Sequence, residues 1–262
     1  MSSFEIRELT SMEELPQISK LEKAVWNMAP IPVHQTFTAM KHGGILLGAF
    51  DDDKMIGFSY SFAGYNGKLP YLCSHMLGIL PNYRQSGLGK NMKLKQAELA
   101  KQRGYRMITW TFDPLESKNA YLNLHQLHAR GVMYKKDLYG DLNDQLNQGL
   151  PTDRIQIEWD LEQQPSHASP ILDANNLLLR MDETNAPRLT KQFTDTFDSA
   201  SDLWFVAIPR YIQTIKQEDF SLAREWRNQT QRVMIKLFEA GFQATDFLAE
   251  GLEKVSYYVF TK

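Results

Sequence analysis

A single cysteine, Cys73, is the scarcest chemical feature of this 262-residue sequence. One thiol excludes an intrachain disulfide and any cysteine-rich metal site. The six histidines form no obvious pair at a metal-ligand spacing with a carboxylate, so we expect no metal. Scarce cysteine also suits a reducing compartment, and we expect a cytoplasmic protein.

Excess charge and long hydrophobic runs are missing as well. The formal net charge is −2, which argues against binding to nucleic acid or to an anionic membrane. No apolar run approaches the roughly 20 residues that span a bilayer. The polar, acidic residues 1–17 do not resemble a secretory signal. Hydrophobic residues make up 43% of the chain, as in soluble globular proteins, and its length is comfortable for two domains.

Strand-like and helical patterns alternate along the sequence. Strand-like runs cover residues 4–9, 44–50, 54–64, 71–80, 106–112, 132–139, 154–161, 176–181, 203–209, 242–248 and 255–260. A first helical pattern begins after Ser11, and we expect Ser11 and Glu14 to cap that helix. Further helical patterns cover residues 33–41, 88–102, 117–130 and a long stretch around Trp226. A stretch rich in proline, serine and glutamine predicts a linker at residues 163–170, between domains at residues 1–162 and 171–262.

The stretch RQSGLG, residues 84–89, joins a strand to a long basic helix. The N–H groups at such a helix start bind anions, and Gly87 and Gly89 let a ligand approach the backbone. The stretch has neither the spacing of a P-loop nor the third glycine of the dinucleotide fingerprint. By itself, this pattern is equally consistent with a simple tight turn.

One part of the sequence has the order strand, PNYRQSGLG, helix, GY, strand and a helix near Asn119. This order resembles motif A of the GNAT superfamily of acyl-CoA-dependent N-acyltransferases, together with the strand and helix that come after that motif. The stretches SHML, WTFDPLESKNA and GLPTDR resemble a branch with a C-terminal extension. The resemblance implies an α/β (α+β) GNAT fold whose mixed central sheet splays between strands four and five, with flanking helices. The smaller C-terminal α/β domain is a candidate for a degenerate GNAT-like half.

The resemblance also implies that acetyl-CoA, or another acyl-CoA, binds in this splay and on the glycine loop. The residues that it assigns to the cofactor are Leu77, Ile79, Arg84, Gln85, Ser86, Gly87, Leu88, Gly89, Lys90 and Asn119. For Asn119, local hydrogen bonds at a helix start are an equally good explanation.

Acyl transfer by direct attack of an amine needs a proton acceptor, a donor to the oxyanion and an acid for the leaving thiolate. His75 is the strongest candidate for the base, although a strand histidine whose ring only hydrogen-bonds to a neighbouring residue is more common. The tyrosine that many GNAT proteins use as the acid aligns with Leu124 here. Tyr121, one turn away, is our candidate substitute, and a water molecule is another.

For the acceptor we expect a primary amine on a small molecule, for which an amino acid is one option, contacted by Trp26 and Arg154. Arg154 suits a substrate carboxylate, while a surface arginine at a strand edge is the simpler interpretation. The alternatives are a succinyltransferase acting on amino acids and a non-catalytic acyl-CoA-binding module. We expect no nucleic acid or membrane partner, and a homodimer stays open.

Overall fold

The computed structural model describes residues 4–84, 86–140, 149–163, 169–193, 201–249 and 254–262. These residues form two compact units. The first contains residues 1–110 and 160–163, and the second contains residues 111–159 and 164–262. The units are not coextensive with the predicted domains, because strand β5 leaves the first unit at Trp110. Residues 164–168 of the predicted linker lie outside the described residues, so the domain boundary stays a prediction.

The first unit is a sheet in the order β1-β2-β3-β4-β5. Its strands are β1 (Glu5–Glu8), β2 (Leu46–Asp51), β3 (Lys54–Tyr65), β4 (Pro70–Ile79) and the first part of β5 (Met107–Phe112). Neighbours are antiparallel up to β4, which runs parallel to β5. A parallel pair after a run of antiparallel strands makes this a mixed sheet, as the resemblance implied.

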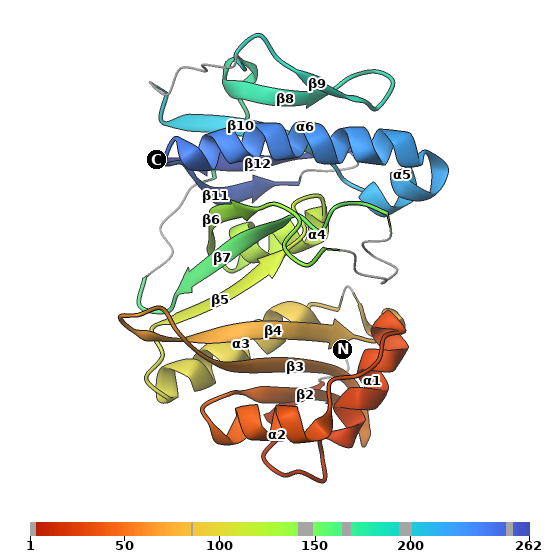
Figure 1. The fold of residues 1–262 in the computed structure, drawn as a ribbon, viewed down its shortest axis with the longest axis vertical. Helices are drawn as coiled ribbons and strands as arrows, with labels where there is room; N and C mark the ends of the chain where they lie inside the picture. Colours follow the sequence, from red (N-terminus) through yellow and green to blue (C-terminus); the bar gives the residue numbers. More distant parts are fainter. Residues whose placement is uncertain (1–3, 85, 141–148, 164–168, 194–200, 250–253) are drawn as a thin grey trace. The chain divides into compact units, whose positions relative to one another are not determined.

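Helices cover both faces of this sheet (Figure 1). On one face, α1 (Pro16–Trp26) and α2 (Val33–Lys41) pack on a core that includes Phe58 and Tyr60. On the other face, α3 (Leu88–Gln102) follows the short helix η1 (Pro81–Tyr83) and contacts Ser59 and Ser74. Successive strand residues point to opposite faces, which is why Ser59 and Tyr60 meet different helices.

The second unit is a sheet in the order β7-β6-β11-β12-β10-β8-β9. Its strands are β6 (Arg130–Lys135), β7 (Arg154–Asp160), β8 (Leu177–Met181), β9 (Pro187–Leu189), β10 (Leu203–Pro209), β11 (Gln243–Leu248) and β12 (Val255–Thr261). Its helices are α4 (Ser117–Ala120), the π-helix η2 (Tyr121–Gln126), η3 (Ala174–Asn176), α5 (Ile212–Glu218) and α6 (Phe220–Glu239). Among these described strands, neighbours are antiparallel except for β10 and β8, which run parallel.

Two helix predictions are wrong in detail. Helix α1 begins at Pro16, not after Ser11, because proline is preorganised for the first helical turn. Glu14 accepts the N–H groups of Thr10 and Ser11 in a turn that precedes the helix. The helix predicted over residues 117–130 is α4 followed by the π-helix η2, which ends at Gln126.

Candidate functional site

The glycine loop enters α3 at Gly87, whose φ of 78° is the left-handed conformation that favours glycine. Nothing lies within 4 Å of a Cβ atom built there, so the space above the loop is open. The first turn of α3 has no side-chain cap, and its first intrahelical bond runs from Asn91 N–H to the Gly87 carbonyl at 3.1 Å. The N–H groups of Leu88, Gly89 and Lys90 therefore lack intrahelical partners and can bind an anion.

Side-chain contacts hold the loop in this shape. Arg84 Nε donates to the carbonyl of Ile79 at 3.1 Å, and Ser86 Oγ donates to the carbonyl of Tyr83 at 2.8 Å. Leu88 is buried and anchors the start of the helix, so only its backbone is available to a ligand. Gln85, another residue predicted to contact the cofactor, lies outside the described residues.

A β-bulge places His75. Tyr60 of β3 pairs with Met76 of β4 and Ser61 pairs with Ser74, so His75 is the extra residue between them. Its ring lies 5.8 Å from the Tyr60 ring and 5.7 Å from the Phe62 ring, between centroids. His75 is an exposed residue, and partial desolvation still lowers the pKa of its ring. The ring is therefore neutral at pH 7, which is the state that accepts a proton.

The bulge lies just beyond the paired part of β4 and β5. Strands β4 and β5 pair at Leu72 with Ile108 and at Cys73 with Thr109, and this register does not extend to the later part of β4. Leu77 and Ile79, both predicted to contact the acyl-pantetheine arm, lie in this later part of β4. Bulges bend strands and frequently lie beside active sites. Neighbouring Cys73 is a poor nucleophile, because burial raises the pKa of its thiol.

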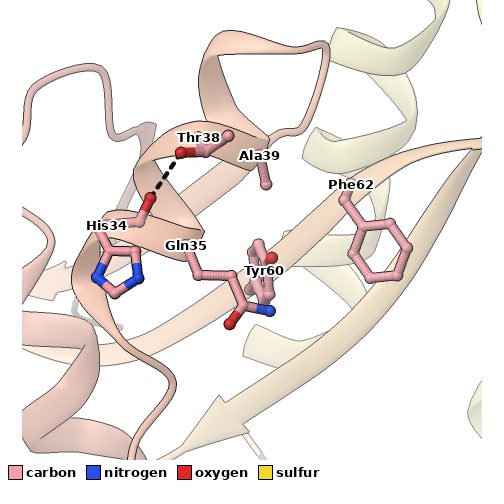
Figure 2. A pocket seen from close by; sticks show the side chains of 6 residues that line it. All are labelled: His34, Gln35, Thr38, Ala39, Tyr60 and Phe62. Carbon is pink, nitrogen blue, oxygen red and sulfur yellow. Dashed lines mark hydrogen bonds between the residues drawn. The ribbon is translucent and has the colours of Figure 1, made fainter.

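An open pocket of about 510 Å³ lies between α2 and β3, on the His75 face of the sheet. Its floor is aromatic, formed by Tyr60 and Phe62, and Gln35 reaches toward Tyr60 from α2 (Figure 2). The remaining lining residues are His34, Thr38 and Ala39. No carboxylate or guanidinium is among the lining residues, so the pocket suits an uncharged, flat group better than a carboxylate.

Beneath the other face, Lys93 of α3 is buried against β4. Its Nζ donates to Ser74 Oγ at 2.7 Å and lies 3.6 Å from the centroid of the Trp110 ring. Burial lowers the pKa of Lys93 from 10.5 to about 7. Its side chain contacts Ser74, beside the bulge residue His75, on the face opposite to α2. As one of the basic residues after the glycine loop, Lys93 was expected to add positive charge around a phosphate; its burial against β4 was not predicted, because a lysine in a basic helix gives no signal of burial.

In the second unit, α4 and η2 carry the other predicted residues. Asn119 is exposed, and its main-chain N–H donates to the carbonyl of Glu116 at 3.0 Å, so its contact with a cofactor stays a prediction. Leu124, at the position of the usual acid, is 0% exposed. Tyr121 stacks on His125 with centroids 4.7 Å apart. His128, just after η2, has a φ of 53°, the conformation that glycine adopts readily.

A histidine–carboxylate pair adjoins Tyr121. His125 Nδ1 lies 3.0 Å from Asp246 Oδ1 of β11, a contact between residues far apart in the sequence that no sequence pattern indicated. His125 belongs to the π-helix η2. π-Helical turns are frequent at functional sites.

The residues predicted to bind the acceptor have structural partners. Arg154 is 8% exposed, and its Nη1 lies 3.8 Å from Asp113 Oδ2, so the interpretation as a surface arginine is wrong. Trp26 packs edge-on against Phe58, with centroids 5.7 Å apart, and its ring covers Gly78. Their contact with an acceptor stays a prediction.

The sequence profile of the Acetyltransferase (GNAT) family matches residues 8–127, from β1 to the end of η2. Residues 8–127 therefore form a GNAT acetyltransferase domain. Members of this family transfer an acyl group from coenzyme A to an amine, and this class of reaction is assigned to the chain. No protein with curated annotation matches the chain significantly in sequence.

Solved structures share the GNAT fold. The ribosomal-protein-S18-alanine N-acetyltransferase of Escherichia coli is 12% identical and superposes with a TM-score of 0.50 over 64% of this chain and 99% of its own. Protein yncA of Salmonella typhimurium, assigned as an acetyltransferase and solved with acetyl-CoA, is 15% identical, with a TM-score of 0.50 over 66% of this chain and 99% of its own. Both alignments leave about a third of this chain without a counterpart.

Two other kinds of site are absent from the described residues. No described helix is long and apolar enough to cross a membrane. Within the same residues, no group of three or more histidine, cysteine, aspartate or glutamate side chains could hold a metal ion.

Proposed function

We propose that the chain transfers an acetyl group from acetyl-CoA to the primary amine of a small molecule, by direct attack within a ternary complex. One observation carries the proposal: the bulge that displays His75 lies where β4 leaves β5 and beside the aromatic pocket. The bulge thus joins the predicted path of the acyl arm to an open pocket for the amine. We propose a cytoplasmic location for the reaction, as the single cysteine suggests.

Each group has a defined role in this proposal. Neutral His75 accepts the proton of the attacking amine, directly or through water. Backbone N–H groups of β4 stabilise the oxyanion, and the uncapped start of α3 binds the pyrophosphate. Tyr121 or a water molecule protonates the leaving thiolate. No covalent intermediate on the protein is needed, which agrees with the protonated state of Cys73.

The lining of the pocket favours an amine whose remaining part is uncharged and flat, because Tyr60 and Phe62 offer ring faces without a counter-ion for a carboxylate. An amino acid held by Arg154 has less support, since that guanidinium already lies beside Asp113. A non-catalytic acyl-CoA-binding module remains the second candidate. The buried Leu124 favours it, because the usual acid is missing.

The decisive test is a thiol-release assay with acetyl-CoA and succinyl-CoA against aromatic amines, polyamines and D- and L-amino acids. We expect release with acetyl-CoA and one class of small amine. In His75→Gln, kcat should fall by about 100-fold, in line with the loss of a general base. In the wild type, the rate should fall as the pH drops below the pKa of His75. This fall should be absent in His75→Gln. Binding of acetyl-CoA without turnover of any amine would favour the non-catalytic module.

A matched pair of glycine variants tests the loop. Gly87 and Gly104 lie at the two ends of α3 with φ of 78° and 81°, and neither has an atom within 4 Å of a built Cβ. Gly87→Trp should abolish acetyl-CoA binding measured by calorimetry, whereas Gly104→Trp should leave it within twofold of wild type. Equal binding by both variants would mean that the loop is only a turn.

A further inference from the structure

The segment that joins β5 to α4, residues 113–117, is held by side chains from the C-terminal part of the chain. Arg227 of α6 donates through Nη2 to Asp113 Oδ2. Tyr258 Oη donates to the carbonyl of Pro114 at 2.8 Å. Gln213 Nε2 donates to Glu116 Oε1 at 2.6 Å, and Ser117 Oγ donates to Ser256 Oγ at 3.1 Å. We call Gln213, Arg227, Ser256 and Tyr258 the clasp.

These contacts are buried and long in range. Arg227 is 2% exposed, and Ser256 and Tyr258 are fully buried. The bonded residues are 97 to 144 positions apart in the sequence. Burying three polar side chains is costly unless they are hydrogen-bonded, so their placement against one short segment fixes that segment.

The held segment determines where α4 begins. Asp113 uses its second carboxylate oxygen, Oδ1, to accept the N–H of Leu115 at 2.8 Å, which shapes the turn. The carbonyl of Glu116 then accepts the N–H groups of Asn119 and Ala120, both at 3.0 Å. The backbone of Asn119 is therefore tied to Glu116, and Glu116 is tied to Gln213. The exposed Asn119 side chain, predicted to contact the cofactor, depends on the clasp for its position.

We propose that the clasp residues are positioning residues for acyl-CoA: they fix the backbone that carries the Asn119 side chain, the group predicted to bind the cofactor, and do not contact the reacting atoms. The inference rests on the proposed function, because it presumes that α4 contacts the cofactor. It assigns to the extension a role in affinity for acyl-CoA rather than in recognition of the amine.

Two variants of the full chain separate this role from stability. Tyr258→Phe removes the donor to the Pro114 carbonyl. Trp226→Phe removes the donor from Trp226 Nε1 to the Asn185 carbonyl, 2.9 Å away, which lies outside the segment. Each change deletes one hydrogen bond to a main-chain carbonyl, a buried one for Tyr258 and a part-buried one for Trp226. Calorimetry should show acetyl-CoA binding about fivefold weaker in Tyr258→Phe, the effect of one displaced contact, and within twofold of wild type in Trp226→Phe.

A double-mutant cycle shows whether the clasp acts through Asn119. If it does, Tyr258→Phe should weaken acetyl-CoA binding in the wild-type background but have little further effect in Asn119→Ala. In turnover, the KM for acetyl-CoA should rise while the KM for the amine stays constant. Additive losses, or equal binding by Tyr258→Phe, Trp226→Phe and wild type, would overturn the inference. Failure of the wild type to bind acetyl-CoA would overturn the proposed function, and this inference with it.

Discussion

Helices α3 and α6 are the two longest helices among the described residues, and their first turns differ. Helix α6 begins at Asp219, whose Oδ1 accepts the N–H of Leu222 at 3.0 Å. Helix α3 begins at Gly87, which has no side chain to offer. A capped helix has already satisfied part of its N-terminal donors, whereas an uncapped one keeps them for a ligand. The comparison suggests that only α3 is built to receive a phosphate.

The two helices also bury different cations. Lys93 of α3 donates to the neutral Ser74, whereas Arg227 of α6 donates to the carboxylate of Asp113. Burial lowers the pKa of Lys93 to about 7. Burial also acts to lower the pKa of Arg227, but the charge of Asp113 outweighs it and raises that pKa. Arg227 is therefore charged at every working pH, while Lys93 loses its proton near neutrality.

The largest expected effect comes from the pair of cations. Arg227→Met leaves the Asp113 carboxylate without its main partner, and we expect a loss of about 3 kcal/mol in the free energy of unfolding. Lys93→Met leaves no charge behind and removes the protonation penalty of the buried lysine, so we expect no loss of stability at pH 7. Urea denaturation of the two variants measures both. Equal losses would remove the distinction between the two sites.

The next effect concerns the uncapped start of α3. Gly87→Asp introduces a carboxylate where the pyrophosphate is proposed to bind, and acetyl-CoA binding should weaken by at least about 100-fold through like-charge repulsion. Gly87→Asn has nearly the same shape, tolerates a positive φ and carries no charge. Gly87→Asn should bind acetyl-CoA at least tenfold more tightly than Gly87→Asp does. If the two variants bind alike in calorimetry, no anion is held at this turn.

The pH dependence of stability should distinguish the helices as well. Unfolded Lys93 has a pKa near 10.5 and folded Lys93 about 7, so between these values the unfolded chain binds the extra proton. Stability therefore rises with pH in this window, and the penalty is complete below pH 7. Relative to Lys93→Met, wild type should gain roughly 1.5 kcal/mol between pH 7 and 8.5. Arg227→Met should show the same pH slope as wild type, and a flat wild-type difference would contradict the buried lysine.

The smallest effect belongs to the cap of α6. Asp219→Ala removes the acceptor for Leu222 N–H and should cost about 1 kcal/mol of stability. Acetyl-CoA binding should not change, because within the described residues the Asp219 carboxylate accepts from Ser221 and Leu222, which lie outside both the glycine loop and residues 113–117. A loss of binding here would show that α6 influences the cofactor by a route other than the clasp.

Local sequence patterns predicted part of the fold and part of the candidate site. Hydrophobic periodicity and glycine or proline signals predicted α2, the end of α3 and β10 at their observed bounds. They could not predict the bulge at His75, which depends on the register between two strands. They also missed the π-helix at Tyr121–Gln126. The burial of Arg154 beside Asp113 was equally hidden, because it depends on a partner distant in the sequence.

The clasp has a consequence for synthesis of the protein on the ribosome. Residues 113–117 leave the ribosome well before Ser256 and Tyr258, which are 139 and 144 positions later than their partners. At the usual rate of about 5–20 residues per second, this delay is roughly 7–30 seconds. A nascent or prematurely terminated chain would carry the whole family motif but not these contacts. Strand β12, which is translated long after residues 113–117, is thus the strand that closes the segment.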